Sequence, residues 1–177
     1  MNNHPSKKSK QRSRNWMIQA LMELMEDKAY SEITISDLCK QADLTRATFY
    51  RHFKCKDDVL IAYSKVLFTE LYGEIEKQDQ LTLEKVLLIY FTFWQKHKDY
   101  CRLLIQSQLT ANSLHCSLQF VKKSMKKIVF PPDINRKQLE IFVAGGLYSC
   151  IEVWMAEGMQ EMPEELCQNV LDCLSVL

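Results

Sequence analysis

Residues 34–53 of this 177-residue chain read TISDLCKQADLTRATFYRHF, and this segment contains two short helix signals with a turn between them. Thr34 begins a capping-box pattern, which predicts a helix over residues 35–41. Thr45 can cap a second helix over residues 46–53, because its hydroxyl can accept a hydrogen bond from the first turn. Two short helices joined by a tight turn have the layout of a helix-turn-helix.

The second of these helices has two different faces. At about 100° per residue, Phe49 and Phe53 point to one side, where they would enter a core. The opposite side carries a small methyl, a hydroxyl, a phenol and a guanidinium, from Ala47, Thr48, Tyr50 and Arg51. Such groups can contact base edges and phosphates in the major groove of DNA. An ordinary amphipathic surface helix has the same periodicity, so the pattern alone leaves both interpretations open.

The formal net charge of +1 conceals an uneven distribution of charge along the chain. Residues 1–56 have 11 Lys/Arg and 6 Asp/Glu, a charge of +5, whereas residues 57–177 have 12 and 16, a charge of −4. A basic first third favours a module that binds a polyanion. Residues 1–14 contain five cations and no acid, and we expect a flexible basic arm there, which either follows DNA phosphates or remains solvated.

The composition excludes several classes of protein. Hydrophobic residues make up 47% of the chain, with only four Gly and four Pro, which argues against a disordered or collagen-like protein. Seven Cys cannot form a fully paired disulfide framework, and no C-x-x-C pair suggests a zinc site. The apolar runs at residues 86–95 and 141–151 are shorter than the roughly 18 residues of a membrane span. We therefore expect a cytoplasmic protein with reduced thiols, no membrane partner and no metal.

Apolar residues at three- and four-residue spacing predict helices along most of the remaining chain, with almost no strand signal. The expected helices cover residues 15–28, 35–41, 46–53, 56–77, 86–94, 100–108, 114–128, 135–157 and 163–177. The chain should therefore be all-α, with about nine helices. Residues 86–94 are apolar nearly all round, which predicts a buried central helix. The lysines within residues 122–127 lie opposite an apolar stripe, and we interpret them as a solvated face rather than a second nucleic-acid patch.

The segment over residues 34–60 resembles the DNA-binding signature of the TetR family of bacterial transcriptional regulators. Its most distinctive part is Thr-Phe-Tyr-Arg-His-Phe at residues 48–53, with Lys56 three positions later. The resemblance is close over residues 12–60. Beyond them it holds only in outline, where residues 144–164 resemble the C-terminal part of one subgroup.

The resemblance implies two domains. A three-helix helix-turn-helix domain would occupy residues 15–56, and a helical ligand-binding and dimerisation domain would occupy residues 57–177. Asp43 stands where the family usually has Gly in the turn, and Asp tolerates the left-handed backbone at a higher cost than Gly. Cys39 replaces a usual Ala, and Cys55 stands where a better helix cap is common, so the start of the fourth helix is expected to be weaker. None of these departures changes the expected fold.

The resemblance also assigns residues to DNA. The expected contacts are Thr34, Thr45, Arg46, Ala47, Thr48, Tyr50, Arg51, His52 and Lys56. Arg46 and Arg51 would read bases. Tyr50 and His52 would contact backbone phosphates, and Lys56 would bind a phosphate at the N-terminus of the fourth helix.

In this family the C-terminal helices form a dimer and enclose a ligand pocket. The apolar stripes of the last two helices independently favour a homodimer, since a four-helix bundle between subunits would bury them; packing within one chain is the alternative. The expected interface contains Gly145, Gly146, Ser149, Trp154, Val170 and Leu174, and the expected effector pocket contains Tyr90, Phe93, Trp94 and Tyr100. Two reading heads imply a near-palindromic operator on double-stranded DNA. The pocket aromatics could equally be ordinary core.

These observations favour one function, leave one alternative open and argue against an enzyme. The main expectation is a repressor that is released from DNA by a small-molecule effector. The alternative is a DNA-binding regulator or activator whose C-terminal domain binds a protein partner, which the short length of that domain favours. An enzyme is not expected, because the sequence has no nucleophile-base arrangement and no glycine-rich phosphate loop, and no cofactor is implied.

Overall fold

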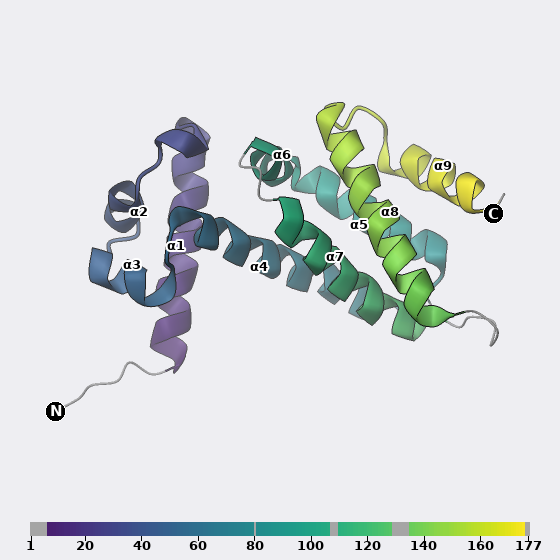
Figure 1. Ribbon diagram of the computed structural model, residues 1–177, viewed down its shortest axis with the longest axis horizontal. Helices are drawn as coiled ribbons and strands as arrows, with labels where there is room; N and C mark the ends of the chain where they lie inside the picture. The colour runs from purple at the N-terminus through teal and green to yellow at the C-terminus, as the bar shows by residue number, and fades with distance from the viewer. Residues whose placement is uncertain (1–6, 80, 107–109, 129–134, 176–177) are drawn as a thin grey trace. The chain divides into compact units, whose positions relative to one another are not determined.

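The computed structural model describes residues 7–79, 81–106, 110–128 and 135–175 (Figure 1). These residues form helices joined by turns and include no strand, so the prediction of an all-α protein is confirmed. The chain divides into two compact units, Met1–Ser64 and Lys65–Leu177. The division lies inside a long helix, whereas the sequence placed a domain boundary between residues 56 and 57.

The first unit contains α1 (Lys7–Asp27), the 3-10 turn η1 (Tyr30–Glu32), α2 (Ile35–Gln41), α3 (Arg46–His52) and the start of α4 (Lys56–Glu76). Helix α1 begins at Lys7 rather than at residue 15, so residues 7–14 of the expected flexible arm are helical; residues 1–6 lie outside the described residues. Lys, Arg and Gln are good helix formers, which explains why this basic segment extends the helix.

The caps expected from the sequence fix the starts of α2 and α3. The Asp37 N–H donates to Thr34 Oγ1 at 3.1 Å, and the Thr34 N–H donates to Asp37 Oδ2 at 2.9 Å, which completes the capping box. The backbone hydrogen bond from Thr34 holds the pKa of Asp37 below its usual range. At the start of α3, the Thr48 N–H donates to Thr45 Oγ1 at 3.1 Å.

The core of the first unit collects apolar side chains from each of its helices. Those with 0% exposure include Met17, Leu21, Leu38, Phe49 and Leu60. Helices α2 and α3 have seven residues each. Isolated helices of that length are not stable in water, so burial of these side chains holds α2 and α3 in place.

Three side chains, Tyr30, Lys56 and Asp57, form a clasp between η1 and the start of α4. The Lys56 ammonium donates to the carbonyl oxygens of Tyr30 and Ile33, the latter at 2.8 Å, and lies 4.2 Å from the centre of the Tyr30 ring. The Tyr30 hydroxyl donates to the Asp57 carboxylate. Burial, together with this hydrogen bond, raises the pKa of Tyr30. The clasp therefore fixes the point at which α4 leaves the first unit.

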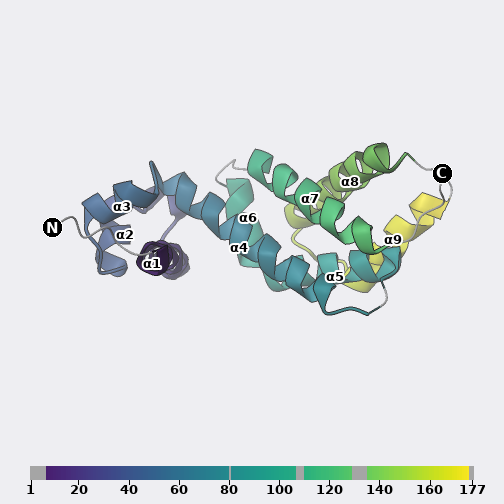
Figure 2. The same cartoon turned by 90° about the horizontal axis from the view of Figure 1, so that it is seen from below.

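The second unit contains the rest of α4, then α5 (Leu83–Lys96), α6 (Lys98–Gln106), α7 (Thr110–Ser124), the 3-10 turn η2 (Met125–Lys127), α8 (Arg136–Ala156) and α9 (Pro163–Ser175). Helix α7 packs along α8, and α5 packs along α9 (Figure 2). Helix α5 lies in the core, as the sequence predicted. Its Tyr90 ring is 5.4 Å from Phe120 of α7, and its Phe91 ring is 6.0 Å from Trp154 of α8.

Asp43, in the turn between α2 and α3, has a left-handed backbone with a φ of 51°. Glycine adopts this conformation without the steric cost of a Cβ atom. We therefore expect Asp43→Gly to raise the free energy of unfolding by about 0.5–1 kcal/mol in urea denaturation. Asp43→Ala should lower it, because Ala keeps the Cβ atom and loses the short polar side chain. Equal stability of all three proteins would contradict this account of the turn.

Lys56→Met keeps the apolar stem of the side chain and removes the ammonium of the clasp. The carbonyls of Tyr30 and Ile33 then lose their donor, and we expect the free energy of unfolding to fall by about 1–3 kcal/mol. Lys54→Met is the matched control, since Lys54 is exposed, and its effect should stay within about 0.5 kcal/mol. Wild-type stability of Lys56→Met in denaturant titration would mean that the clasp does not stabilise the fold.

Candidate nucleic-acid interface

Helix α3 presents one polar face to solvent because its other face is buried. Phe49 is completely buried and Phe53 is 3% exposed, which matches the faces expected from the sequence. The predicted contacts Thr45, Arg46, Ala47, Tyr50 and Arg51 are all exposed, whereas Thr48 and His52 are half-buried. The structure therefore brings most of the predicted contacts of α3 onto one accessible surface.

Hydrogen bonds align the side chains along this outer face. Arg51 Nη2 donates to Thr48 Oγ1 at 3.3 Å, and Thr48 Oγ1 lies 3.0 Å from Thr45 Oγ1. The contact with Thr48 uses one of the five N–H donors of the guanidinium, and a bidentate contact with guanine needs two. Arg51 is thus oriented by the helix and still able to read a base.

The two aromatic residues of this face differ in exposure. Tyr50 is 52% exposed, and its ring lies edge-on to Phe49 with 5.4 Å between the ring centres. This contact holds the ring against Phe49 and leaves about half of the Tyr50 surface accessible. His52 lies beside Phe53, with 6.3 Å between the ring centres, and is less accessible than Tyr50.

The other two predicted contacts lie at the N-termini of α2 and α4. Thr34 is exposed, and its hydroxyl donates to the Asp37 carboxylate at 2.8 Å. Lys56 is half-buried, and its ammonium points into the clasp, where two of its three donors meet carbonyl oxygens. A phosphate could take only the remaining donor. Sequence reasoning missed this inward role, because Tyr30 lies 26 positions away along the chain.

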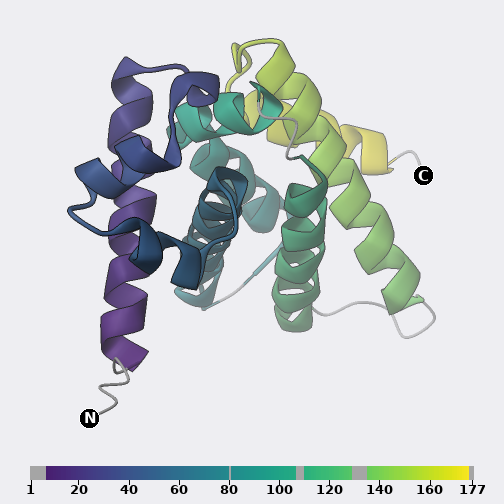
Figure 3. The same ribbon diagram turned by 60° about the vertical axis from the view of Figure 1, so that its left-hand side comes forward.

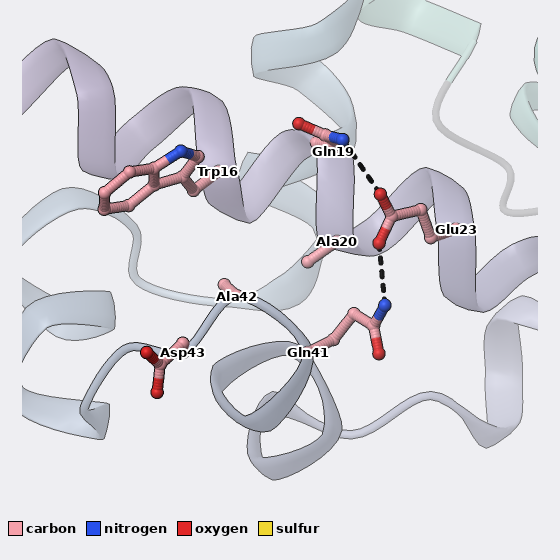
Figure 4. A pocket seen from close by; sticks show the side chains of 7 residues that line it. All are labelled: Trp16, Gln19, Ala20, Glu23, Gln41, Ala42 and Asp43. Atoms are coloured by element: carbon pink, nitrogen blue, oxygen red, sulfur yellow. Dashed lines mark hydrogen bonds between the residues drawn. The ribbon is translucent and has the colours of Figure 1, made fainter.

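A groove of about 360 Å³ lies between α1 and the end of α2 (Figure 4). The Glu23 carboxylate is its central group and accepts hydrogen bonds from Gln19 Nε2 at 2.9 Å and Gln41 Nε2 at 2.7 Å. The contact with Gln41 ties α1 to α2 and so supports the angle between them. Trp16 and Asp43 also line the groove, which has no lysine, arginine or histidine among its described lining residues and does not suit a phosphate.

The four residues of the expected effector pocket lie in different surroundings. Tyr90 and Trp94 line a cavity of about 30 Å³, close to the volume of one water molecule. Ser117, which the sequence analysis did not select, also lines it, and its Oγ lies 3.4 Å from the Tyr90 hydroxyl. Burial raises the pKa of Tyr90. Phe93 lines a separate groove between α4 and α5, and Tyr100 is 2% exposed and stacks on Trp94.

Helix α8 carries an exposed apolar stripe. Phe142 is 61% exposed and Val153 is 56% exposed, and Gly146 and Ser149 lie between them at helical spacing with their surfaces also exposed. A Cβ atom added at Gly145 or Gly146 would meet no atom within 4 Å. Packing within this chain therefore does not require glycine at either position. An apolar face with small residues at its centre is suited to close contact with another helix.

The remaining residues of the expected dimer interface differ in their exposure to solvent. Val170 and Leu174 of α9 are half-buried and keep part of their surface accessible. Trp154 is 2% exposed, and its Nε1 donates to the carbonyl oxygen of Glu161 at 3.0 Å. Trp154 thus belongs to the core of its own chain, because it packs against Phe91 of α5.

By length and composition alone, α8 is also the one described helix that could span a membrane. An 18-residue window within Arg136–Ala156 has a mean hydropathy of 1.4, so the apolar segment is longer than the run at residues 141–151 suggested. Only 22% of that window is buried, which reflects the exposed stripe. Among the described residues, no group of three or more His, Cys, Asp or Glu could hold a metal ion.

Family models match both units of the chain. Residues 17–63 match the bacterial regulatory proteins of the tetR family, and residues 82–175 match the transcriptional regulator C-terminal region. Among individual proteins, the nucleoid occlusion factor SlmA of Marinomonas sp. (strain MWYL1) is 21% identical over 135 residues. The matched part makes up 70% of this chain and 68% of SlmA.

Solved structures share the fold over nearly the whole chain. Lin0861 from Listeria innocua has a TM-score of 0.75 at 17% sequence identity, covering 99% of this chain and 96% of Lin0861. The dihydroxyacetone kinase operon activator DhaS has a TM-score of 0.67 at 17% identity, covering 93% of this chain and 94% of DhaS. At this level of identity, the likeness demonstrates a common fold.

The C-terminal family model alone spans more than half of the chain, and the N-terminal model spans the helix-turn-helix. Regulators of this family are soluble, non-enzymatic proteins that bind DNA, typically as dimers. The expected absence of enzymatic activity agrees with this family membership. The chain belongs to the TetR family of bacterial regulatory proteins and is a DNA-binding transcriptional regulator.

Proposed function

We propose that this chain is a cytoplasmic, homodimeric repressor whose binding to a near-palindromic operator is controlled by a small-molecule effector. The observation that carries the DNA-reading part is the outer face of α3. There, burial of Phe49 holds Arg46 and Arg51 at the surface of a capped helix. A helix of this kind fits the major groove, and its arginines can pair with guanine.

The proposed contacts divide into base reading and phosphate binding. Arg46 and Arg51 read bases, and Ala47 and Thr48 contact base methyls or the edge of the groove. The proposed phosphate contacts are Thr34, Thr45, Tyr50, His52 and Lys56. Among these, Lys56 contributes mainly through the clasp, since most of its donors are used within the protein.

The proposed dimer interface is the exposed stripe of α8 together with α9. Gly145, Gly146 and Ser149 allow two α8 helices to approach closely, while Val170 and Leu174 extend the contact along α9. Burial of apolar surface as exposed as Phe142 would stabilise such a dimer by about 25 cal/mol per Å². A two-fold dimer presents two copies of α3, which accounts for the proposed near-palindromic operator.

Effector control is proposed to act through α4. This helix begins at the clasp in the first unit and ends in the second unit. An effector bound in the second unit would favour a dimer in which the spacing of the two α3 helices fits the operator poorly. The population of the DNA-binding form would then fall, and transcription would resume.

A second candidate is a regulator or activator whose second unit binds a protein partner. The observation that favours it is the small cavity lined by Tyr90 and Trp94, which at about 30 Å³ has room for little more than one water molecule. The structural neighbour DhaS is an operon activator. For this candidate, small molecules would leave operator affinity unchanged, and a purified partner protein would alter it.

We expect Arg51→Ala to weaken operator binding by about 5- to 150-fold and to relax the preference at one base pair of each half-site. The operator would first be recovered by sequencing fragments of the source genome bound by the purified protein. Affinity would then be measured by fluorescence anisotropy at about 150 mM salt, because phosphate contacts depend on ionic strength.

The matched control is Arg102→Ala, which removes an exposed arginine from α6 in the second unit. It should bind the operator like the wild type. Wild-type affinity and specificity of Arg51→Ala would exclude α3 as the proposed reading helix. Failure to enrich any site would instead favour the second candidate, in which a partner is needed for binding.

We expect Phe142→Arg to convert the dimer into a folded monomer, since a charge in the centre of an apolar interface is not compensated. The side chain is exposed in the single chain, so helicity should be unchanged. Sedimentation velocity gives the oligomeric state, and circular dichroism gives the helicity. Leu114→Arg, at an exposed leucine of α7, is the control and should remain dimeric. A dimeric Phe142→Arg would place the interface elsewhere.

A further inference from the structure

Helix α7 lies beside the later part of α4 in the second unit (Figure 3). A groove of about 220 Å³ lies between these two helices, and its polar lining is rich in hydrogen-bond donors. Lys65 and Thr69 come from α4, whereas His115, Gln119 and Lys123 come from α7. Lys65 and Lys123 are exposed, so their ammonium groups can reach a molecule in the groove. The groove adjoins the small cavity lined by Tyr90 and Trp94, since Phe68 lines both.

The charge of this groove favours an anion. No Asp or Glu is found among its described lining residues, and none of the ion pairs in the described part of the chain involves Lys65, His115 or Lys123. The Lys123 ammonium instead lies 4.9 Å from the centre of the Tyr72 ring, a cation–π contact that holds it beside α4. The groove between α4 and α5 differs, because Glu70 is among its lining residues.

The floor of the groove is apolar. Phe68 of α4 and Phe120 of α7 both line it, with 6.5 Å between their ring centres, and Cys116 adds a buried thiol. A volume of 220 Å³ equals about seven water molecules and is below the roughly 300 Å³ at which drug-sized pockets begin. The groove therefore suits a small ligand that combines an anionic group with a compact apolar body.

We propose that this groove is the effector site and takes a small organic anion, whose carboxylate or phosphate pairs with the lysine at one end of the groove, Lys65 or Lys123, and whose apolar part lies against Phe68 and Phe120. The proposal rests on the effector control proposed above and assigns its site and ligand class. A charge-assisted hydrogen bond from that ammonium group holds the anionic group, and the second lysine adds a longer-range attraction. A ligand bound in this way joins α4 to α7, and α4 is the helix that begins at the clasp.

Binding is tested on the full-length protein without DNA by calorimetric titration. The probes are benzoate and phenyl phosphate, with benzyl alcohol as their neutral counterpart and inorganic phosphate as the anion without an apolar part. We expect saturable binding of benzoate or phenyl phosphate at low-millimolar concentration or below, and the tighter of the two identifies the preferred anionic group. Benzyl alcohol and inorganic phosphate should each bind at least about tenfold more weakly.

The double variant Lys65→Gln, Lys123→Gln keeps both side chains polar and should weaken anion binding at least about tenfold. Its matched control is Lys122→Gln, Lys126→Gln, which removes two positive charges from the same region outside the groove and should bind like the wild type. Circular dichroism checks that both variants fold. The proposal is overturned if neither organic anion binds saturably, or if the Lys65, Lys123 variant binds as tightly as the wild type.

Operator affinity is measured separately, with and without the tighter-binding anion. A loss of affinity in the wild type that is absent in the Lys65, Lys123 variant supports both the site and the effector control. Saturable anion binding that leaves operator affinity unchanged overturns the effector role of this groove, while the proposed binding of the operator by α3 still stands. Operator affinity without ligand is measured independently of anion binding. A protein that binds its operator but no anion therefore contradicts the proposed groove and leaves the proposed DNA contacts of α3 intact.

Discussion

The burial of Phe49 is the interaction on which the proposed DNA-reading surface depends. Helix α3 has only seven residues, which is too short for a stable isolated helix, so its existence and orientation come from packing rather than from propensity. Removal of a buried phenylalanine side chain typically costs about 3–5 kcal/mol, a large part of the stability of a small domain. With Phe49 in the core, the helical period places Arg51 on the opposite face, while Arg46, three positions before Phe49, is exposed at the edge of the buried face.

The clasp of Tyr30, Lys56 and Asp57 extends this constraint to α4. It joins η1 and the residue that follows it to the first turn of α4, so the start of α4 is held against the segment that leads into α2. The later part of α4 lines two grooves in the second unit. Helix α4 therefore begins at the clasp in the first unit and carries Lys65, Phe68 and Thr69 of the proposed effector groove in the second.

Positively charged residues serve three different purposes in this chain, depending on their surroundings. Arg51 is exposed and aligned by Thr48, and it faces outward. Lys56 is half-buried and donates hydrogen bonds to backbone carbonyl oxygens. Lys65 and Lys123 border a groove with an aromatic floor. The near-zero net charge therefore gives little information about function, since the distribution of the charges among these environments decides what each one does.

The amino-acid sequence by itself determined the helix-turn-helix, because its signals are local. Caps act within three residues, and the faces of α3 follow from the helical period. Only the tertiary structure decided three other features. Lys56 points inward, Trp154 is buried, and side chains leave little free space around Tyr90. Tyr90 meets Ser117 across 27 positions and Lys56 meets Tyr30 across 26. Such contacts depend on how helices pack, and the periodicity of a single helix contains no information about its neighbours.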